Sequence, residues 1–214
     1  MPWIWNAFIL FLAYIIGSVP NAIWVGRSFY KIDVRNHGSK NAGSTNTIRV
    51  LGYKAGIPVL LLDILKGWVA VKLIHFSHYH IPVSGEYINF QLLLGLAAIM
   101  GHIFPLFANF RGGKGVATFV GVILAIDPVS TLICLGVFLV TLIATKYVSL
   151  SSMIAGLSFP VMVIVVFNTT TPSLVIFSLI VFVLLLFTHQ KNIERLLRNQ
   201  ESKASFLFKN REKH

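Results

Sequence analysis

Charged residues are scarce in this sequence: Asp, Glu, Lys and Arg make up 12% of its 214 residues. A soluble globular domain carries about 25% charged residues, because its surface must be wetted. Apolar residues reach 56% and the mean hydropathy is +0.77. These values exclude a disordered chain and an ordinary cytosolic enzyme, and they indicate an integral membrane protein.

Cysteine and acidic residues are also few. The only cysteine, Cys134, excludes a disulfide scaffold, and its apolar surroundings favour inert packing over reactivity. Seven acidic residues face 18 Lys and Arg, a formal net charge of +11. This excess fits the basic cytoplasmic loops of any polytopic protein, or loops that bind anionic substrates or headgroups. We expect no nucleic-acid partner, because no soluble basic domain exists to present one.

Long apolar runs predict the membrane-spanning segments, since a spanning helix needs about 20 apolar residues. The run at 116–126 is short, about 17 Å at 1.5 Å per residue. Two architectures remain open for an all-α polytopic integral membrane protein: seven transmembrane helices, one of them short, or five plus a re-entrant hairpin. The expected spans are 3–25, 55–75, 89–108, 116–126, 129–145, 153–168 and 173–189.

The basic residues are strongly asymmetric between alternate connections. Connections 76–88, 127–128 and 168–172 contain no Lys or Arg. The positive-inside rule therefore places the N-terminus outside and the C-terminus in the cytoplasm. We expect a single transmembrane domain over 1–214, with a basic cytoplasmic tail at 190–214. Sixteen of the 18 Lys and Arg residues fall in four segments: 27–54, 109–115, 146–152 and the tail after His189.

The first basic loop predicts a phosphate site. Between Arg35 and Arg49 it alternates glycines with small hydrogen-bonding side chains. Such residues are common in plain loops, but their density favours phosphate binding, because a guanidinium fork matches phosphate oxygens and glycines expose backbone N–H groups. The small polar side chains are Ser39, Asn41, Ser44, Thr45 and Asn46.

The second basic loop, residues 109–118, combines Gly112, Gly113 and Gly115 with Lys114 and opens directly into an apolar run. Glycines, one cation and a helix N-terminus form an anion cradle. The spacing of a Walker A loop is missing. A tight turn between two spans is the simpler alternative, but the neighbouring phosphate loop favours a functional role.

Several further polar residues have two interpretations each. Ser149, Ser151 and Ser152 are helix N-cap residues or part of a site. His189 and Asn192 lie on one face if the last span continues as a helix, and are interfacial or functional. Inside the second span, Asp63 and Lys66 are expected to pair and face the bundle interior, as a structural pair rather than a catalytic one.

Together these motifs resemble the bacterial acyl-phosphate:glycerol-3-phosphate acyltransferase family (PlsY type). That family carries a G-S-G-N-x-G-A-T-N-x-x-R loop, a G-H-x-x-P…F-x-G-G-K-G-V-A-T loop, a Y-V-S-L-S-S segment and a terminal H-x-x-N-I-x-R-L. This chain departs from it at Lys40 and Asn199, where the family usually has glycine, and at Ser44. The four motifs match in order at 38–52, 101–118, 147–152 and 189–196.

The resemblance implies a bacterial inner-membrane enzyme that transfers an acyl chain from acyl phosphate to the sn-1 hydroxyl of glycerol 3-phosphate, giving lysophosphatidic acid and phosphate, without cofactor or metal. The missing H-x-x-x-x-D pair argues against a CoA-dependent acyltransferase. By this resemblance, the expected catalytic residues are Ser39, Arg49, Lys114, His189 and Asn192. The expected substrate-binding residues are Asn41, Thr45, Gly112, Gly113, Gly115, Ser149, Ser151 and Ser152.

Two other classes of function fit a basic membrane protein. A transporter of a phosphate-bearing anion would spread polar groups through its spans and show symmetric halves. Here only Asp63 and Lys66 are deeply charged and the polar motifs share one side. A non-catalytic subunit that binds lipid headgroups would tolerate the loss of His189. The enzyme is the expected function, acting on lipid-borne substrate in the membrane as a monomer.

Overall fold

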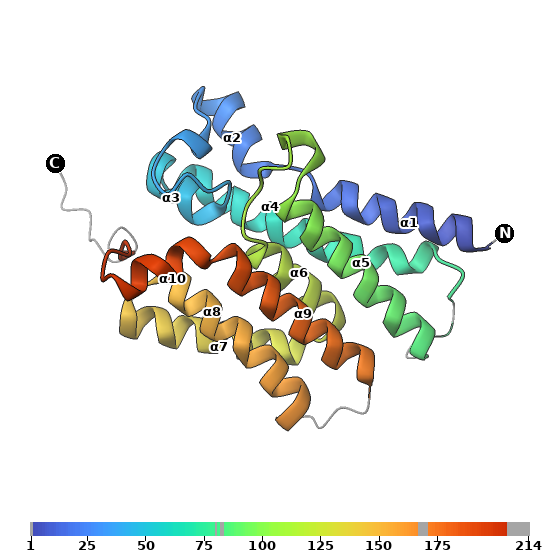
Figure 1. Cartoon of the computed structure of the whole chain (residues 1–214). Coiled ribbons are helices and arrows are strands. Elements are labelled where there is room, and N and C mark those ends of the chain that lie inside the picture. Colours follow the sequence, from blue (N-terminus) through green and yellow to red (C-terminus); the bar gives the residue numbers. More distant parts are fainter. Residues whose placement is uncertain (1, 80, 82–83, 167–170, 205–214) are drawn as a thin grey trace.

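The structure, a computed structural model, describes residues 2–79, 81, 84–166 and 171–204 (Figure 1). Every regular element among them is helical, which confirms the all-α expectation. The helices are α1 (Pro2–Gly17), α2 (Asn21–Tyr30), α3 (Ser44–Leu51), α4 (Tyr53–Lys72), α5 (Gly85–Ile103), α6 (Val116–Ile126), α7 (Pro128–Thr145), α8 (Val148–Val161), α9 (Pro172–Thr188) and α10 (Gln190–Leu197).

Three helical segments of the described chain are long and apolar enough to cross a membrane: 85–108, 128–145 and 148–166. The number rises to five if the bent pairs α1–α2 and α9–α10 each count as one span. The short helix α6 has the predicted bounds and only 11 residues. Helix α4 has 20 residues and covers most of the expected span 55–75, but it begins two residues earlier, ends at Lys72 and carries charged residues along its course.

The expected first span at 3–25 is not one helix. It breaks after Gly17, and α2 continues at an angle of 43°. Pro20 lies at the break and has no N–H to donate to a continuing helix, and a proline also disfavours helical geometry in the residue before it. The loop expected at 27–54 is likewise partly helical, because α2 extends to Tyr30 and α3 lies within it.

Helices α4 and α6 approach each other closely along the bundle. A side chain on Gly67 would overlap the carbonyl oxygen of Thr118, and one on Gly121 would overlap that of Ile64. Small residues at such crossings allow backbones to pack within a membrane. This close packing holds the short helix α6, and the loop in front of it, against the longer helix α4.

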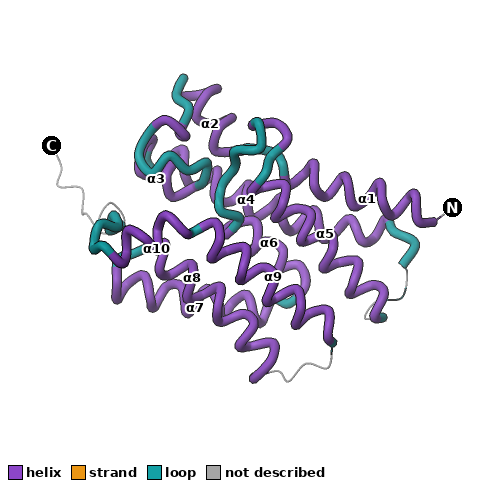
Figure 2. Tube along the Cα trace, in the orientation of Figure 1, coloured by secondary structure: helices purple, strands orange, loops and turns teal. Residues whose placement is uncertain are grey.

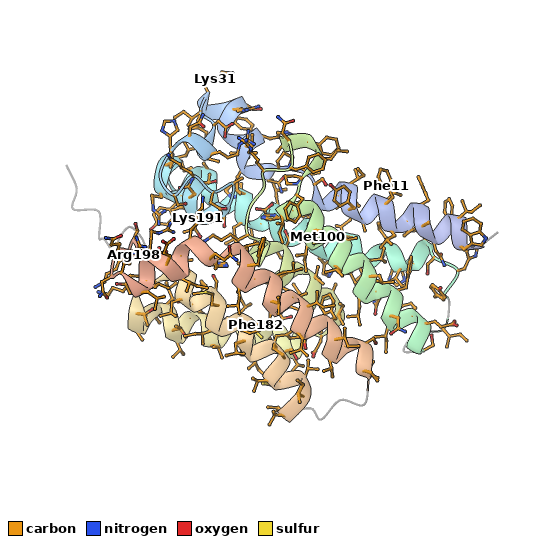
Figure 3. The ribbon with its side chains drawn as sticks, in the orientation of Figure 1. Phe11, Lys31, Met100, Phe182, Lys191 and Arg198 are labelled. Carbon is orange, nitrogen blue, oxygen red and sulfur yellow. The ribbon has the colours of Figure 1, made fainter. Side chains whose placement is uncertain are left out.

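The elements that carry the predicted motifs gather at one end of the bundle. Helices α3 and α10 lie at this end and the start of α1 lies at the other (Figure 1). The loop before α3 lies at the same end (Figure 2), and Arg35 in it donates a 3.1 Å hydrogen bond to the Ala108 carbonyl in the loop before α6. Among the labelled side chains, Lys191 and Arg198 mark this end, whereas Phe11 and Phe182 lie along the bundle (Figure 3).

Candidate active site

A cavity of about 1080 Å³ opens between these elements and brings most of the predicted residues together. It is bordered by α3 and α4 on one side and by α7 and α8 on the other, with the start of α6 and the α9–α10 bend between them. The predicted residues that line it are Ser39, Asn41, Thr45, Arg49, Lys114, Gly115, Ser149, Ser152, His189 and Asn192.

Gly112, Gly113 and Ser151 do not line this cavity. The N–H of Gly112 donates to the Ile103 carbonyl (3.2 Å) and that of Gly113 to the His102 carbonyl (3.1 Å). These two glycines therefore fasten the loop to the end of α5, and the expected cradle of free backbone donors is wrong for them. Ser151 donates to the Tyr147 carbonyl one turn back (2.8 Å), within its own helix.

The structure also contradicts the interpretation of Ser149, Ser151 and Ser152 as N-cap residues. Tyr147 occupies the N-cap of α8 and makes no side-chain cap hydrogen bond. Ser149 instead donates to the carboxylate of Glu201 (2.7 Å) from the cavity wall. Ser152 lines the cavity while its hydroxyl donates to the Val148 carbonyl (2.8 Å).

Asn46, buried at the start of α3, fixes the shape of the first loop. Its side-chain oxygen accepts the N–H of Ser39 (2.8 Å). Its amide donates to the carbonyls of Val34, His37 and Asn41 at 2.8 to 3.1 Å. A single buried amide thus closes the loop around Ser39, from Val34 to Asn41, a role that its place in a polar run did not reveal.

The two arginines that flank this loop differ in role. Arg35 pairs with Asp33 (2.8 Å) outside the cavity, and the guanidinium holds the pKa of that carboxyl well below its usual range. Arg49, half-buried on α3, lines the cavity. Burial, together with the nearby charge of Arg195, lowers the pKa of Arg49. Of the two, Arg49 is the one placed to bind a phosphate.

Lys114 lies at the centre of the polar end. Its Nζ donates to the side-chain oxygen of Asn192 (2.5 Å), which brings two predicted residues from distant parts of the chain together. Burial, helped by the charges of Arg195 and Arg49 and opposed by that of Glu201, lowers the pKa of Lys114 to about 8. A partly desolvated ammonium here interacts strongly with a phosphate.

Glu201 is the main residue that the motifs missed. It accepts hydrogen bonds of 2.7 Å from Ser149, Asn192 and Arg195, so it ties α8 and α10 to the chain after α10. Burial opposes its ionisation, but these donors hold the pKa of Glu201 below its usual value. The scarcity of acidic residues was the available signal, because each one in such a chain requires a partner.

His189 lies at the bend between α9 and α10, which meet at 61°. The continuous helix assumed for His189 and Asn192 is therefore absent, although both side chains line the cavity. His189 is 2% exposed, and its Nδ1 lies 2.8 Å from the Leu185 carbonyl oxygen. Because a carbonyl only accepts, Nδ1 carries the proton, and in the neutral ring Nε2 keeps its lone pair.

Four helices begin at the polar end of the cavity. The first residues of α3, α6, α8 and α10 line it, and none of the four has a side-chain cap hydrogen bond. Helix N-termini carry partial positive charge and unsatisfied N–H groups. Their convergence with Arg49, Lys114 and Arg195 makes this end suited to bind more than one phosphate.

A buried polar cluster supports the polar end from beneath. Asp63 pairs with Lys66 (2.9 Å) and accepts from Asn21 (2.9 Å), which confirms the predicted pair and its inward direction. His102 joins it, 3.7 Å from Asp63 and 3.0 Å from the hydroxyl of Thr118. The cluster connects α2, α4, α5 and α6 directly below the turn that presents Lys114.

The remainder of the cavity is apolar. It continues between α6, α7 and α8, where its lining is mostly Phe, Leu, Ile, Val and Ala side chains. A phosphate-binding end joined to a hydrocarbon-lined arm fits a molecule that has both an anionic head and an acyl tail. Within the described chain, no group of three or more His, Cys, Asp or Glu side chains could hold a metal ion.

Fold and cavity together define a helical membrane protein with an anion site at one end of its bundle. Residues 7–199 match the model of the glycerol-3-phosphate acyltransferase family, and the chain belongs to that family. A glycerol-3-phosphate acyltransferase of Listeria welshimeri is 46% identical, with 92% of this chain and 95% of that protein covered. One of Chlorobium phaeobacteroides is 40% identical, with 92% and 96% covered.

Two solved structures of PlsY, an integral membrane glycerol 3-phosphate acyltransferase, have the same fold. The glycerol 3-phosphate form superposes with a TM-score of 0.83 at 32% identity, covering 95% of this chain and 99% of that one. The lysophosphatidic acid form gives 0.81 at 31% identity. The resemblance inferred from the four motifs is therefore confirmed at the level of family and fold.

The pKa of Lys114 predicts a pH dependence for binding at this site. Its ammonium is charged below about pH 8 and neutral above it, so kcat/KM for an anionic substrate should fall as the pH rises through that value. A phosphate monoester is already a dianion there, because its second pKa is about 6, which leaves the enzyme as the titrating partner. In Lys114→Arg, whose side chain stays charged, kcat/KM should no longer fall over this pH range. A fall that persists in this variant would mean that another group titrates.

Proposed function

We propose that this protein transfers an acyl chain from acyl phosphate to the sn-1 hydroxyl of glycerol 3-phosphate, giving lysophosphatidic acid and phosphate. One observation carries the proposal: a single cavity joins a cationic end, with Arg49 and Lys114, to an apolar arm. Both substrates carry phosphate and one carries a hydrocarbon chain. The two PlsY structures are described as glycerol 3-phosphate and lysophosphatidic acid forms, a substrate and a product of this reaction.

The arrangement supports direct transfer without an acyl-enzyme. The glycerol hydroxyl attacks the acyl carbonyl carbon, the bond from that carbon to the phosphate oxygen breaks, and phosphate leaves. Arg49, Lys114 and the converging helix N-termini hold the two phosphates, with Ser39, Asn41, Thr45 and Gly115 around them. The amide of Asn192 stabilises the developing oxyanion. His189 takes the hydroxyl proton at Nε2.

A serine nucleophile finds little support in the site. An activated serine needs a neighbouring base that is itself oriented by a third group. Ser149 donates to Glu201, but Glu201 is also bound by Asn192 and Arg195, which weakens it as a base. Ser152 donates to a backbone carbonyl. Neither hydroxyl is paired with His189, whose Nδ1 is bound to Leu185.

Donor choice tests the proposed function. Purified protein should release inorganic phosphate from palmitoyl phosphate only when glycerol 3-phosphate is added, and it should form lysophosphatidic acid in equal amount. Palmitoyl-CoA should give no product, because the sequence lacks the H-x-x-x-x-D pair of the CoA-dependent acyltransferases. The Lys114→Met protein, prepared in parallel, controls for contaminating enzymes. Equal turnover with palmitoyl-CoA in the absence of acyl phosphate would contradict the proposal.

We further propose that the polar end faces the cytoplasm and that the chain crosses the inner membrane seven times, acting as a monomer. The asymmetry of basic residues supports this topology, and α6 would be the short crossing. The polar tail expected at 190–214 begins with α10, and residues 205–214 of it lie outside the described chain.

Single-cysteine labelling tests the sidedness. In a Cys134→Ala background, Ile81→Cys and Leu197→Cys place thiols at positions that are 73% and 81% exposed. An impermeant maleimide added to intact spheroplasts should label position 81 at once and position 197 only after permeabilisation. The reverse pattern would mean that the topology is inverted. Labelling of both positions from outside would mean that the chain crosses the membrane an even number of times between them, which contradicts the proposed seven crossings.

A further inference from the structure

The apolar arm of the cavity has a depth that can be read from the α7–α8 hairpin. These helices are antiparallel and joined by two residues, Lys146 and Tyr147. On α7 the cavity lining extends as far as Thr131. At 1.5 Å per residue, Thr131 lies about 21 Å from the polar end of the helix at Thr145. The cavity thus reaches almost the full length of α7.

The deep end of the arm is closed by packed side chains. Thr131 is fully buried, and Ile123 and Cys134 are 1% and 6% exposed although they line the cavity. Ile123 and Cys134 belong to a buried apolar cluster with Phe119 and Phe159, whose rings meet edge to face at 5.5 Å. A chain that follows the arm therefore ends against a wall and does not emerge from the far side.

The depth of the arm corresponds to a definite chain length. An extended polypeptide spans at most about 3.3–3.6 Å per residue, or roughly 1.2 Å per backbone bond, and an extended alkyl chain is similar. A 21 Å arm therefore holds roughly 17 bonds, the length of a chain with 16 to 18 carbons. Cys134 lies about 16 Å from the polar end, at the depth of the fourteenth bond.

We propose that Thr131, with Cys134 just above it, forms a floor that sets the maximum length of the acyl chain this enzyme accepts. The inference rests on the proposed function, because it assigns the apolar arm to the acyl donor. Each additional methylene gains burial until the chain reaches the floor, about fourfold in affinity per group. Beyond the floor, further carbons must displace packed side chains, and overpacking of a core is costly.

Two substitutions at different depths test the floor. Cys134→Phe fills the arm just above its end. Ala155→Leu, on α8, fills it about 10 Å from the start of that helix, or roughly nine bonds deep. Both residues line the cavity and neither contacts the polar end. The purified variants would be assayed with saturated acyl phosphates of eight to eighteen carbons, and the ratio of kcat/KM between long and short donors compared.

We expect the preferred donor length to shorten as the arm is filled nearer its polar end. The wild type should prefer donors of 16 to 18 carbons, and Cys134→Phe should lower the ratio of kcat/KM for C16 to that for C10 at least tenfold. Ala155→Leu should move the optimum about five carbons shorter than Cys134→Phe does. Ile133→Phe adds the same ring to the adjacent residue, which is 36% exposed and outside the cavity lining, and should leave the profile as in the wild type. The ratio is internal to each preparation, so partial misfolding does not change it.

Two other outcomes overturn the floor. If all proteins use long and short donors in wild-type proportion, the acyl chain lies in the surrounding lipid. If both variants lower activity equally at every chain length, the arm shapes the site without measuring the chain. Absence of turnover by the wild type with any donor would instead refute the proposed function, so the two failures are distinguishable.

Discussion

Lys114→Met is expected to lower kcat/KM by roughly 10²- to 10³-fold, the loss that follows removal of one donor aimed at charge that develops in a transition state. The ammonium lies in the polar end of the cavity, held by Asn192 at 2.5 Å. When the acyl–phosphate bond breaks, negative charge grows on the leaving phosphate. A desolvated cation stabilises that charge far more than one in water. Steady-state kinetics with acyl phosphate and glycerol 3-phosphate give the measurement.

Lys191→Met is the matched control for this prediction. Lys191 also borders the cavity but is exposed, so solvent and salt screen its charge. We expect a loss below about threefold there, in line with the small effect of exposed charges. Equal losses in the two variants would mean that the cavity responds only to its overall charge. In that case Lys114 would have no specific contact with substrate.

The family and most of the site could be predicted from the sequence because its motifs are local. The run from Gly101 to Thr118 and the segment from His189 to Leu196 each keep their functional groups within a few residues. Apolar length likewise predicted α6 and α7 almost to the residue. Where a motif is short and rigid, spacing along the chain translates directly into position.

The hydrogen-bond partners of these polar groups could not be predicted from their spacing along the chain. Gly112 and Gly113 have the composition of an anion cradle, but their N–H groups are taken by carbonyls of α5, more than eight residues earlier. Glu201 acquires its role only when α8 and α10 come together around it. Both depend on contacts between distant segments, and one sequence holds no record of them.

The departures from the family pattern have a backbone explanation. Lys40 and Asn199 stand where the family usually has glycine, and both have positive φ, 59° and 56°. That region of backbone geometry disfavours side chains by roughly 1–2 kcal/mol, and asparagine tolerates it better than lysine. The glycine preference at these positions therefore reflects the turn before α3 and the turn after α10, and Lys40 carries the larger strain.

His189→Ala is expected to lower kcat by about 10²- to 10⁴-fold, the usual contribution of a general base. Nδ1 of the ring donates to the Leu185 carbonyl, so Nε2 is the basic nitrogen and can accept the proton of the glycerol hydroxyl. His189→Asn separates this role from positioning. Its amide can donate to the same carbonyl, but it has no basic nitrogen.

If Nε2 is the base, both His189 variants should be impaired to a similar degree, with normal folding by circular dichroism. If His189 only positions substrate, the Asn variant should retain activity within about tenfold of wild type, and an oxygen of the acyl phosphate must then accept the proton.

A covalent route has a separate test, in which the wild type is incubated with acyl phosphate alone, quenched and measured by intact mass. An acyl adduct on Ser39 or another residue, discharged by added glycerol 3-phosphate, would replace direct transfer by a two-step mechanism. We expect no adduct on Ser149 or Ser152, because Ser149 donates to Glu201 and Ser152 to a backbone carbonyl, and not to His189.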